Sequence, residues 1–593
     1  MKKLQKVFAL VLISVMALGA FGCGAKQDEE NTPENPSADG IFTPGTYVAE
    51  ETGHNGPIKV TVTVTEDTIE SIEVDAADET KAIAEPAIES VIEKIIASQG
   101  LGVDAVTGAT VSTDAVLVAV AAALAEAGAD IEALKKIKVE TEKIDVSDRE
   151  TDVVIIGAGG AGMSAAVEAA SQGKSVIIVE KMPIVGGNTN RATGGINASE
   201  TSIQKQEGID DTTDSFYDDT FKGGKELNDP ELLRVMVENS AGAVDWLNDL
   251  GAGLTRVSLS GGATNPRIHT PADGSAVGPV VVEALQNKLE ELDVEILMET
   301  VVTSILEEDG QAVGIEATTI DGSTFEIRAK AVIIAAGGFG ANSDMVESFR
   351  PDLVGFSTTN HAGATGDGIE LGQAMNASLK DIEQIQIHPT TDPESGYMFT
   401  EGLRGDGAIL INAEGMRFTD ELLTRDVVSM NILKQTDGIA YLVTNKEMSD
   451  ENAALAGYIT KGYAIECVTL KDVADAIGAE EADVTQTMEK YKEAVSGGTD
   501  MEFGRTHLDK TLEEGPYYIL KVTPGIHHTM GGLKIDTETH VLNVDGDIIK
   551  GLYAAGEVTG GIHGANRIGG NAMTDIIVFG RIAGQTAIKE LAK

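Results

Sequence analysis

The sequence predicts an α/β protein, and two stretches of the chain carry that prediction. A run of buried-strand residues at 152–156 leads into the glycine-rich segment 157–162 (Gly-Ala-Gly-Gly-Ala-Gly) and an alanine-rich helical segment. A second apolar run at 176–179 ends in Glu180, which completes a β-α-β unit of the dinucleotide-binding type. Far upstream, residues 58–64 alternate apolar and polar side chains at the period of a strand. A separate, smaller α+β unit therefore precedes a Rossmann-type domain.

The N-terminus has the pattern of an export signal followed by a tether. Two lysines precede an apolar run at 7–21, which ends just before the lone Cys23, as is typical of a signal peptide. The small residues there are similar to a bacterial lipobox, from which Phe21 departs, so we expect residues 1–22 to be removed and Cys23 to be lipidated. Residues 23–40 then form a polar tether. An uncleaved membrane anchor is the alternative, for which the apolar run is short.

Composition narrows the possible partners. The chain carries 95 acidic and 44 basic side chains, a formal charge of -51, which excludes nucleic acid as a partner and predicts a solvated acidic surface. Cys23 and Cys467 are the only cysteines, so no disulfide framework, iron–sulfur cluster, c-type haem or other metal site is predicted. With 593 residues, 42% of them hydrophobic, the chain can bury several cores.

Residues 41–127 are predicted to form the compact α+β unit. A second strand at 68–74 follows the first, and residues 82–97 have helical spacing. Residues 128–150 are charged and mixed, and we expect them to be a linker.

The segment 104–110 (Asp-Ala-Val-Thr-Gly-Ala-Thr) lies at the end of this unit. It resembles the acceptor site of FMN-binding domains, in which a flavin transferase joins the FMN phosphate to the last Thr hydroxyl, here Thr110. The Gly-Ala pair would leave that hydroxyl uncrowded. A plainer alternative is that these residues only open the apolar helix expected at 111–127. The resemblance implies covalent FMN on Thr110, and two redox centres on one chain suggest an electron relay.

Each residue type in the dinucleotide segment has a physical role. Gly157 permits the tight turn, Gly159 lets the backbone approach a pyrophosphate at the helix N-terminus, and Gly162 allows close packing of helix on strand. Glu180 ends the second strand, where it is placed to bind a ribose hydroxyl.

Further glycine-rich segments favour FAD over NAD, which does not need them. They are 186–189 (Gly-Gly-Asn-Thr), 194–197 (Gly-Gly-Ile-Asn), 335–338 (Ala-Ala-Gly-Gly), 365–368 (Thr-Gly-Asp-Gly) and 556–561 (Gly-Glu-Val-Thr-Gly-Gly). From about residue 150 onward the chain resembles the soluble fumarate reductase family of flavoproteins, related to succinate dehydrogenase flavoprotein subunits and to urocanate reductase. No His occurs between 157 and 200, so the resemblance implies non-covalent FAD. The expected cofactor-binding residues are Gly157, Gly159, Ala161, Gly162, Glu180, Asn188, Thr189, Gly194, Gly195, Asp367, His528, Glu557, Asn571 and Ala572.

The resemblance also implies a substrate site. Reduction of a double bond conjugated to a carboxylate needs a hydride on one carbon, which flavin N5 supplies, and a proton on the other. The planar fork of Arg567 and the donor of His527 suit one carboxylate, and His388 with Thr400 would hold the second. The expected substrate-binding residues are His388, Met398, Thr400, His527 and Arg567.

Arg425 stands in the family's proton-donor position. A free guanidinium holds its proton with a pKa above about 12, so a neighbour must return the proton. Glu401 and Arg404 are the implied relay, and with Arg425 they form the expected catalytic set. Taken singly, Arg425 beside Asp426 could be a surface ion pair, and His528 could be a core histidine.

The order of the motifs predicts the architecture. FAD motifs pause near residue 367 and resume at 528, so residues 383–526 are expected to be an inserted cap and the FAD-binding domain to comprise 151–382 and 527–593. The predicted fold is thus an FAD-binding Rossmann-type domain with an inserted α+β cap domain, preceded by a small α+β FMN-binding domain. Cap closure would bring cap residues onto bound substrate and exclude water.

Substrate identity depends on one position. Met398 resembles the residue that the fumarate-reducing branch has at this position, whereas urocanate reductases carry an aromatic residue there. Tyr397 is adjacent, so a shift of one residue in the match to the family would reverse the inference. We expect a lipoprotein on the extracytoplasmic face of a bacterial membrane that receives electrons from a membrane-linked donor and reduces fumarate. Urocanate or another α,β-unsaturated carboxylate is the alternative substrate. A non-catalytic flavin electron-carrier lipoprotein is the alternative of another class, which would have no need of the Arg425, Glu401 and Arg404 set.

Overall fold

The computed structural model describes residues 41–592, apart from 139–145, 260, 509 and 511. The predicted signal peptide, tether and lipidated Cys23 lie outside these residues. Within the described part of the chain, we find no helix with both the length and the apolar character that a membrane crossing requires.

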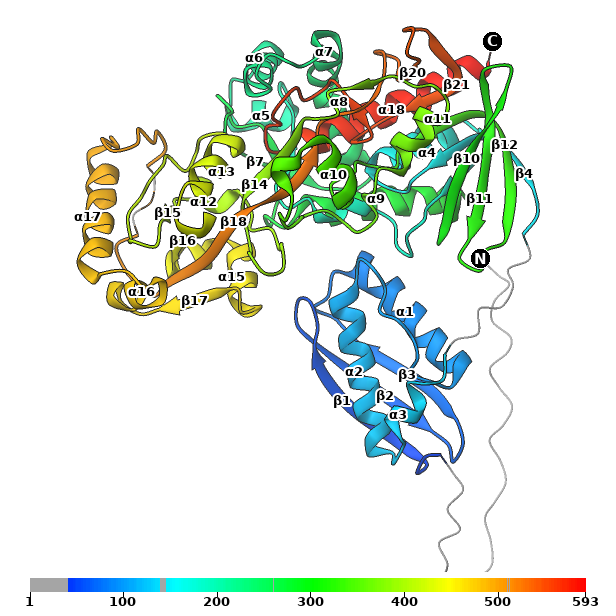
Figure 1. The fold of residues 1–593 in the computed structure, drawn as a ribbon, viewed down its shortest axis with the longest axis horizontal. Coiled ribbons are helices and arrows are strands. Elements are labelled where there is room, and N and C mark those ends of the chain that lie inside the picture. Colours follow the sequence, from blue (N-terminus) through cyan, green and yellow to red (C-terminus); the bar gives the residue numbers. More distant parts are fainter. Residues whose placement is uncertain (1–40, 139–145, 260, 509, 511, 593) are drawn as a thin grey trace, which may run out of the picture.

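The N-terminal unit is a three-stranded antiparallel sheet covered by two helices (Figure 1). Its elements are β1 (Gly45–Thr52), β2 (Pro57–Val64), β3 (Ile69–Asp75), α1 (Lys81–Ser98), α2 (Thr110–Glu126) and α3 (Ile131–Leu134). The expected strands and helices are therefore present. The unit also contains β1, which we did not predict, and it extends past residue 127, because Leu134 of α3 is buried in the same core. The first part of the predicted linker thus belongs to this domain.

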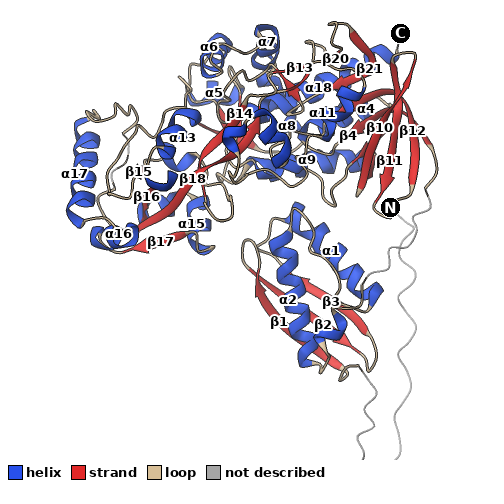
Figure 2. Cartoon of the chain, viewed as in Figure 1, coloured by secondary structure: helices blue, strands red, loops and turns tan. Residues whose placement is uncertain are grey.

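The FAD-binding domain is built on an eight-stranded sheet. The elements of this domain are β4 (Arg149–Ile156), α4 (Gly160–Ser171), β5 (Val176–Val179), η1 (Gly187–Arg191), β6 (Ile196–Asn197), α5 (Ser202–Glu207), α6 (Thr213–Gly223), α7 (Pro230–Glu238), α8 (Ser240–Asp249), β7 (Leu254–Ser258), β8 (Ile268–Pro271), α9 (Val277–Glu291), β9 (Glu295–Leu297), β10 (Thr300–Glu308), β11 (Gln311–Thr319), β12 (Thr324–Ile334), α10 (Ser343–Phe349), η2 (Pro351–Leu353), α11 (Asp367–Ala374), β13 (Leu379–Lys380), β19 (Gly532–Lys534), β20 (His540–Leu542), β21 (Ile548–Ala554), β22 (Thr559–Gly560) and α18 (Asn571–Leu591). Strand β4 runs parallel between β12 and β5, and β21 adds to β12 from the far end of the chain. Helix α18 packs along α4 (Figure 2). The two halves of the domain therefore share one core.

The inserted region forms a second sheet with its own core. Its elements are β14 (Ile385–Thr391), α12 (Gly402–Gly405), β15 (Ile409–Ile411), α13 (Arg425–Leu433), η3 (Thr436–Gly438), β16 (Ala440–Asn445), α14 (Lys446–Glu451), α15 (Ala453–Thr460), β17 (Ala464–Cys467), α16 (Leu470–Ile477), α17 (Glu481–Gly497) and β18 (Tyr517–Thr529). Strand β18 is the centre of this sheet and pairs with β14, β16 and β17. In Figure 1 the long β18 runs from the body of the molecule into this lobe.

The FMN-binding unit contacts both other parts of the molecule. Ile184, from the FAD-binding domain, is buried in the core of the N-terminal unit. Lys461, from the cap, places its Nζ 3.0 Å from Nε2 of His54 in the same unit. The N-terminal unit is thus docked where the other two domains meet.

Candidate functional site

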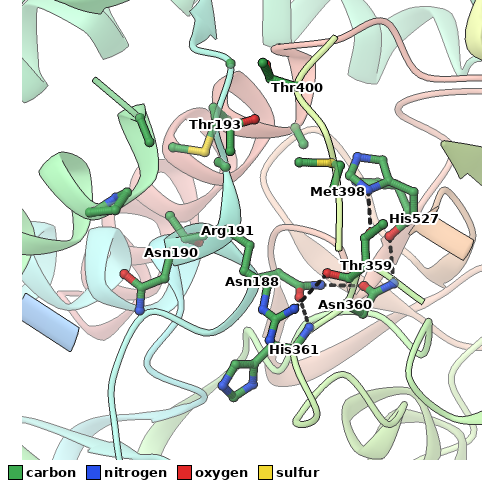
Figure 3. A pocket seen from close by; sticks show the side chains of 18 of the residues that line it. Asn188, Asn190, Arg191, Thr193, Thr359, Asn360, His361, Met398, Thr400 and His527 are labelled. Atoms are coloured by element: carbon green, nitrogen blue, oxygen red, sulfur yellow. Dashed lines mark hydrogen bonds between the residues drawn. The ribbon is translucent and has the colours of Figure 1, made fainter. Parts of the chain in front are cut away.

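A single cavity of about 1560 Å³ extends from the acceptor segment of the N-terminal unit to the predicted catalytic residues of the cap. Thr110 and every predicted substrate-binding and catalytic residue line it. The predicted cofactor-binding residues also line it, except Gly162 and Asn571, which lie behind it. Figure 3 shows part of the wall, where Asn188 and Arg191 face Met398 and His527.

The glycines at the start of α4 have the close approaches that the sequence predicted. A Cβ on Gly162 would lie 2.0 Å from the carbonyl oxygen of Gly157, and Gly157 itself has a φ of 103°. A side chain at Gly159 would meet only one atom, 3.9 Å away, so the backbone there is open to the cavity. An uncovered helix N-terminus suits a pyrophosphate, so these residues fit FAD.

Glu180 accepts hydrogen bonds from the backbone N–H groups of Ala158 at 2.7 Å and Met182 at 2.8 Å. Burial raises the pKa of Glu180 above its ordinary value, although these two hydrogen bonds oppose the shift. The carboxyl group therefore fixes the two loops around it, and it also lines the cavity at the position expected for a ribose.

A polar network joins the distant cofactor motifs. Asn188 Nδ2 donates to Asn360 Oδ1 at 2.7 Å and to Glu557 Oε2 at 3.2 Å. Glu557 accepts in turn from the Thr529 backbone N–H at 3.0 Å, next to His528. His528 is buried, and its Nδ1 has no hydrogen-bond partner among the described residues. These contacts close the FAD-binding wall with side chains from four separate segments.

The predicted carboxylate-binding groups lie together. The rings of His388 and His527 are 5.1 Å apart, and His527 Nδ1 lies 2.7 Å from the hydroxyl of Thr359. Burial, then Arg425, lowers the pKa of both imidazoles well below the ordinary value. Burial, then Arg425, also lowers the pKa of Arg567 to about 9. Buried cations gathered in this way favour an anionic substrate.

Strand pairing, rather than domain closure, places His388 beside His527. His388 on β14 lies opposite Gly525 on β18, and Gln386 lies opposite His528. Both histidines therefore sit on the strand pair that joins the two domains.

The predicted proton relay is assembled as an ion-pair chain. Arg425 approaches Glu401 Oε2 through Nη2 at 2.6 Å and Nε at 2.8 Å. Arg404 Nη2 lies 3.2 Å from the other oxygen, Glu401 Oε1. Burial alone would raise the pKa of Glu401, but Arg425 and Arg404 outweigh it and hold the pKa below the ordinary value. The carboxylate is thus anionic between two guanidinium groups.

The surface ion pair between Arg425 and Asp426 does not form. Asp426 instead pairs with Lys225 at 2.7 Å, whereas Arg425 turns inward and is only 8% exposed. Arg425 is the first residue of α13, which packs on β14. The helix therefore aims this side chain at the site.

A buried charge network supports Arg404 from behind. Its Nη1 donates to the backbone carbonyl of Glu421 at 2.7 Å, and its own carbonyl accepts from Arg505 Nη2 at 2.6 Å. The Glu421 carboxylate is held by Arg417 through two hydrogen bonds of 2.9 Å, and Arg417 also reaches Asp500 at 3.0 Å. These groups fix the inner end of the relay.

Sequence reasoning missed Gln386. Its Oε1 accepts from Arg425 Nη1 at 3.2 Å, and its Nε2 donates to the backbone carbonyl of Arg567 at 2.8 Å. One amide therefore lies between the predicted proton donor and the arginine that is predicted to bind a carboxylate. Its place two residues before His388 on the same strand was the available signal, since alternate residues share a face.

The acceptor residue Thr110 opens α2, as the plainer alternative stated, and is also exposed to the cavity. Its hydroxyl donates only a long hydrogen bond of 3.4 Å, to the carbonyl of Val106. Two residues on, Ser112 donates to Glu79, which also accepts from the Asn55 backbone N–H at 2.7 Å. An accessible hydroxyl beside a polar wall fits a covalently held flavin phosphate.

Comparison with known families agrees with this geometry. Residues 152–573 match the family model described as FAD binding domain, and residues 53–125 match that described as FMN-binding domain. The chain belongs to the fumarate reductase-like family of FAD-dependent oxidoreductases acting on C=C bonds, and carries an N-terminal FMN-binding domain.

Individual relatives differ in how much they share. The chain is 41% identical over 552 residues to the NADH:fumarate oxidoreductase of Klebsiella pneumoniae (strain 342), which covers 93% of this chain but only 59% of that protein. It is 35% identical to the urocanate reductase of Eggerthella lenta, over 96% of each chain. Among solved structures, the open conformation of a flavocytochrome c3 fumarate reductase matches with a TM-score of 0.65 at 38% identity, covering 75% of this chain and 79% of that one.

Proposed function

We propose that this chain is an exported flavoprotein that reduces fumarate to succinate, with electrons passing from FMN on Thr110 to FAD. The observation that carries the proposal is the chain of Arg425, Glu401 and Arg404, which opens into the same cavity as His527 and Arg567. A flavin carrier without turnover has no use for a proton relay. The site therefore favours an enzyme over the electron-carrier alternative.

The carboxylate groups of the substrate would be held at two ends. Arg567, whose buried Nε has no partner among the described residues, and His527 would bind one carboxylate. His388 and Thr400 would bind the other, which fixes the double bond in one orientation. FAD, when bound, supplies the hydride from N5. The positive charge of Arg567 beside the first carboxylate would stabilise the negative charge that develops on the α-carbon.

Arg425 would then give its proton to that carbon. Glu401, held anionic by its two arginines, would take a proton from Arg404 and pass it to Arg425, and Arg404 would then regain a proton from solvent. Gln386 keeps Arg425 and Arg567 in separate positions, so that one binds while the other donates.

The position of Met398 favours fumarate over urocanate. Met398 lies beside His527 in the cavity (Figure 3). Tyr397 lines the same cavity, but its ring stacks on Tyr463 with centroids 4.6 Å apart, and its hydroxyl lies 3.3 Å from Lys461. The residue at the substrate end is thus the aliphatic one, which supports a small dicarboxylate rather than an imidazole-bearing substrate.

The test is a screen of enoates against dithionite-reduced dye with the purified protein. We expect fumarate to be reduced with far higher kcat/KM than urocanate or acrylate. Met398→Tyr should erode the preference for fumarate, whereas the matched change Tyr397→Phe should leave the ratio unchanged. Higher kcat/KM for urocanate in the wild type would replace fumarate by the second candidate, and no turnover of any enoate would leave the carrier function.

Export and lipidation are part of the same proposal. The motif at residues 7–23 supports them, and they would place the protein beside a membrane-linked electron donor. Cys23→Ala should release the protein from the membrane fraction.

A further inference from the structure

His361 carries a buried donor that no described residue uses. The side chain is 4% exposed, and its Nδ1 accepts a hydrogen bond from the Gly363 backbone N–H at 3.1 Å. Burial, then Arg191 and Lys181, lowers the pKa of His361 to about 4, so the ring is neutral and its proton is on Nε2. That Nε2 has no hydrogen-bond partner among the described residues. A buried donor without a partner is unfavourable, so such a group is expected to bind a ligand.

The free nitrogen faces the FMN-acceptor segment. A Cβ on Gly108 would lie 2.8 Å from His361 Nε2 and 2.6 Å from Cδ1 of Ile184. Gly108 is two residues before Thr110, and all of these residues line the cavity that continues to the FAD-binding motifs. The imidazole therefore belongs to the FAD-binding domain but points at the FMN-binding domain.

Arg191 adds a positive charge at the same place. Figure 3 shows Arg191 next to His361 and Asn188, and its Nη1 donates to the Thr359 carbonyl at 3.2 Å. No carboxylate in the described part of the chain lies within ion-pair distance of Arg191, whereas the nearby Lys181 is paired with Asp367 at 2.7 Å. A neutral donor beside an unpaired guanidinium has the chemistry of an anion-binding site.

We propose that His361 and Arg191 complete the FMN site by binding an anionic group of FMN, so that the cofactor is held by both domains. The inference rests on the FMN attachment at Thr110 proposed above. FMN offers two such groups. The phosphate ester is negative in both redox states, and the pyrimidine ring becomes negative when the flavin takes up two electrons and one proton. In either case the FAD-binding domain orients FMN relative to FAD.

The test compares His361→Leu, His361→Gln and Arg191→Met with the wild type in the full-length holoprotein. FMN fluorescence on a denaturing gel gives the covalent flavin per chain, and spectroelectrochemical titration gives the FMN reduction potential. FAD content and the melting temperature report folding. His507→Leu is the matched control, because it makes the same change at an exposed histidine.

If the ring is the bound group, His361→Leu and Arg191→Met should shift the FMN redox equilibrium by tenfold to a hundredfold, which lowers the potential by about 30 to 60 mV for a two-electron couple. If the phosphate is the bound group, both variants should lose covalent FMN severalfold while the remaining FMN keeps its potential. His361→Gln retains an N–H donor and should restore most of either effect.

Wild-type flavin content and wild-type potential in both Arg191→Met and His361→Leu would overturn the inference. Should His361→Leu fail to bind FAD, Arg191→Met decides alone, because its side chain lies on the cavity wall and supports no core. Absence of covalent FMN in the wild type would instead overturn the attachment at Thr110 and this inference with it.

Discussion

The donor role proposed for Arg425 depends on the residues that surround it. Three guanidinium groups, from Arg404, Arg425 and Arg567, share one carboxylate, Glu401, in a buried space. Burial lowers the pKa of Arg404 and the pKa of Arg567 below the ordinary value of a guanidinium. Arg425 contacts the shared carboxylate directly, which is the arrangement that the proposed proton transfer needs.

Replacement of Arg425 tests this role. Arg425→Ala should lower kcat by several orders of magnitude, since general acid catalysis alone is worth about 10²- to 10⁴-fold and charge stabilisation is lost with it. Arg425→Lys should restore only part of the lost kcat, because a point charge on a flexible side chain cannot reproduce the guanidinium geometry. Stopped-flow and steady-state reduction of fumarate measure the loss, with FAD content as the control. Substantial turnover in an FAD-replete Arg425→Ala protein would assign the proton to another group.

The two substrate-site histidines should be silent in the pH profile of the free enzyme. Burial, then Arg425, lowers the pKa of His388 and His527 well below the ordinary value, so both stay neutral through the physiological range and protonate only in acid. We therefore expect kcat/KM for fumarate, which reports the free enzyme, to show no inflection near pH 6.5. An inflection there that disappears in His527→Gln would show that a cationic histidine binds the substrate.

At the scale of elements, a helix or strand that depends on contacts between nearby residues could be predicted from the sequence. One that depends on contacts between distant residues could not. The β4–α4–β5 unit could be predicted because its glycines are needed for close contacts between residues near in sequence, such as Gly162 with Gly157. Strand β1 was missed because its residues alternate between half-buried and exposed, with no strongly apolar face. Its strand conformation depends on pairing with β2. Likewise Gln386 gains its role from residues 39 and 181 positions away, and its place two residues before His388 was the single local signal for that role.

The register of β14 on β18 explains why the site could be partly predicted. The family order of motifs identified His388 and His527, but the pairing of their strands shows that both belong to the joint between domains. Arg404 on α12 and Arg425 on α13 lie on the cap side of that joint.

The buried network behind α12 should stabilise the cap. Arg417 neutralises two carboxylates, from Glu421 and Asp500, whose side chains are 0% and 2% exposed. Arg417→Met keeps the apolar stem but leaves both carboxylates without this cation, which should cost about 3–5 kcal/mol in the free energy of unfolding. Arg328→Met breaks an exposed pair with Glu308 and should cost much less, because water and salt screen an exposed ion pair. Urea denaturation measures both, and equal losses would mean that the network adds no stability.

At the scale of the whole molecule, one cavity connects the FMN-binding domain to the proposed reduction site between the other two domains. Thr110 faces that cavity, and the docking of its domain against Ile184 and Lys461 keeps it there. The arrangement makes sense if electrons enter at one end and leave on substrate at the other.

Thr110→Ala separates these two ends. The change removes the hydroxyl that would carry the phosphate ester, and since that hydroxyl makes only a 3.4 Å hydrogen bond to Val106, the fold should be preserved. Covalent flavin fluorescence on a denaturing gel should vanish while FAD remains bound. Fumarate reduction by dithionite-reduced dye, which can deliver electrons directly to FAD, should continue, but reduction driven by membrane fractions should stop. Thr110→Ser keeps a hydroxyl and should retain covalent FMN. Covalent FMN in the alanine variant would show that the flavin is attached to another residue. Undiminished turnover with membrane fractions in the absence of covalent FMN would mean that electrons reach FAD by a route that bypasses this domain.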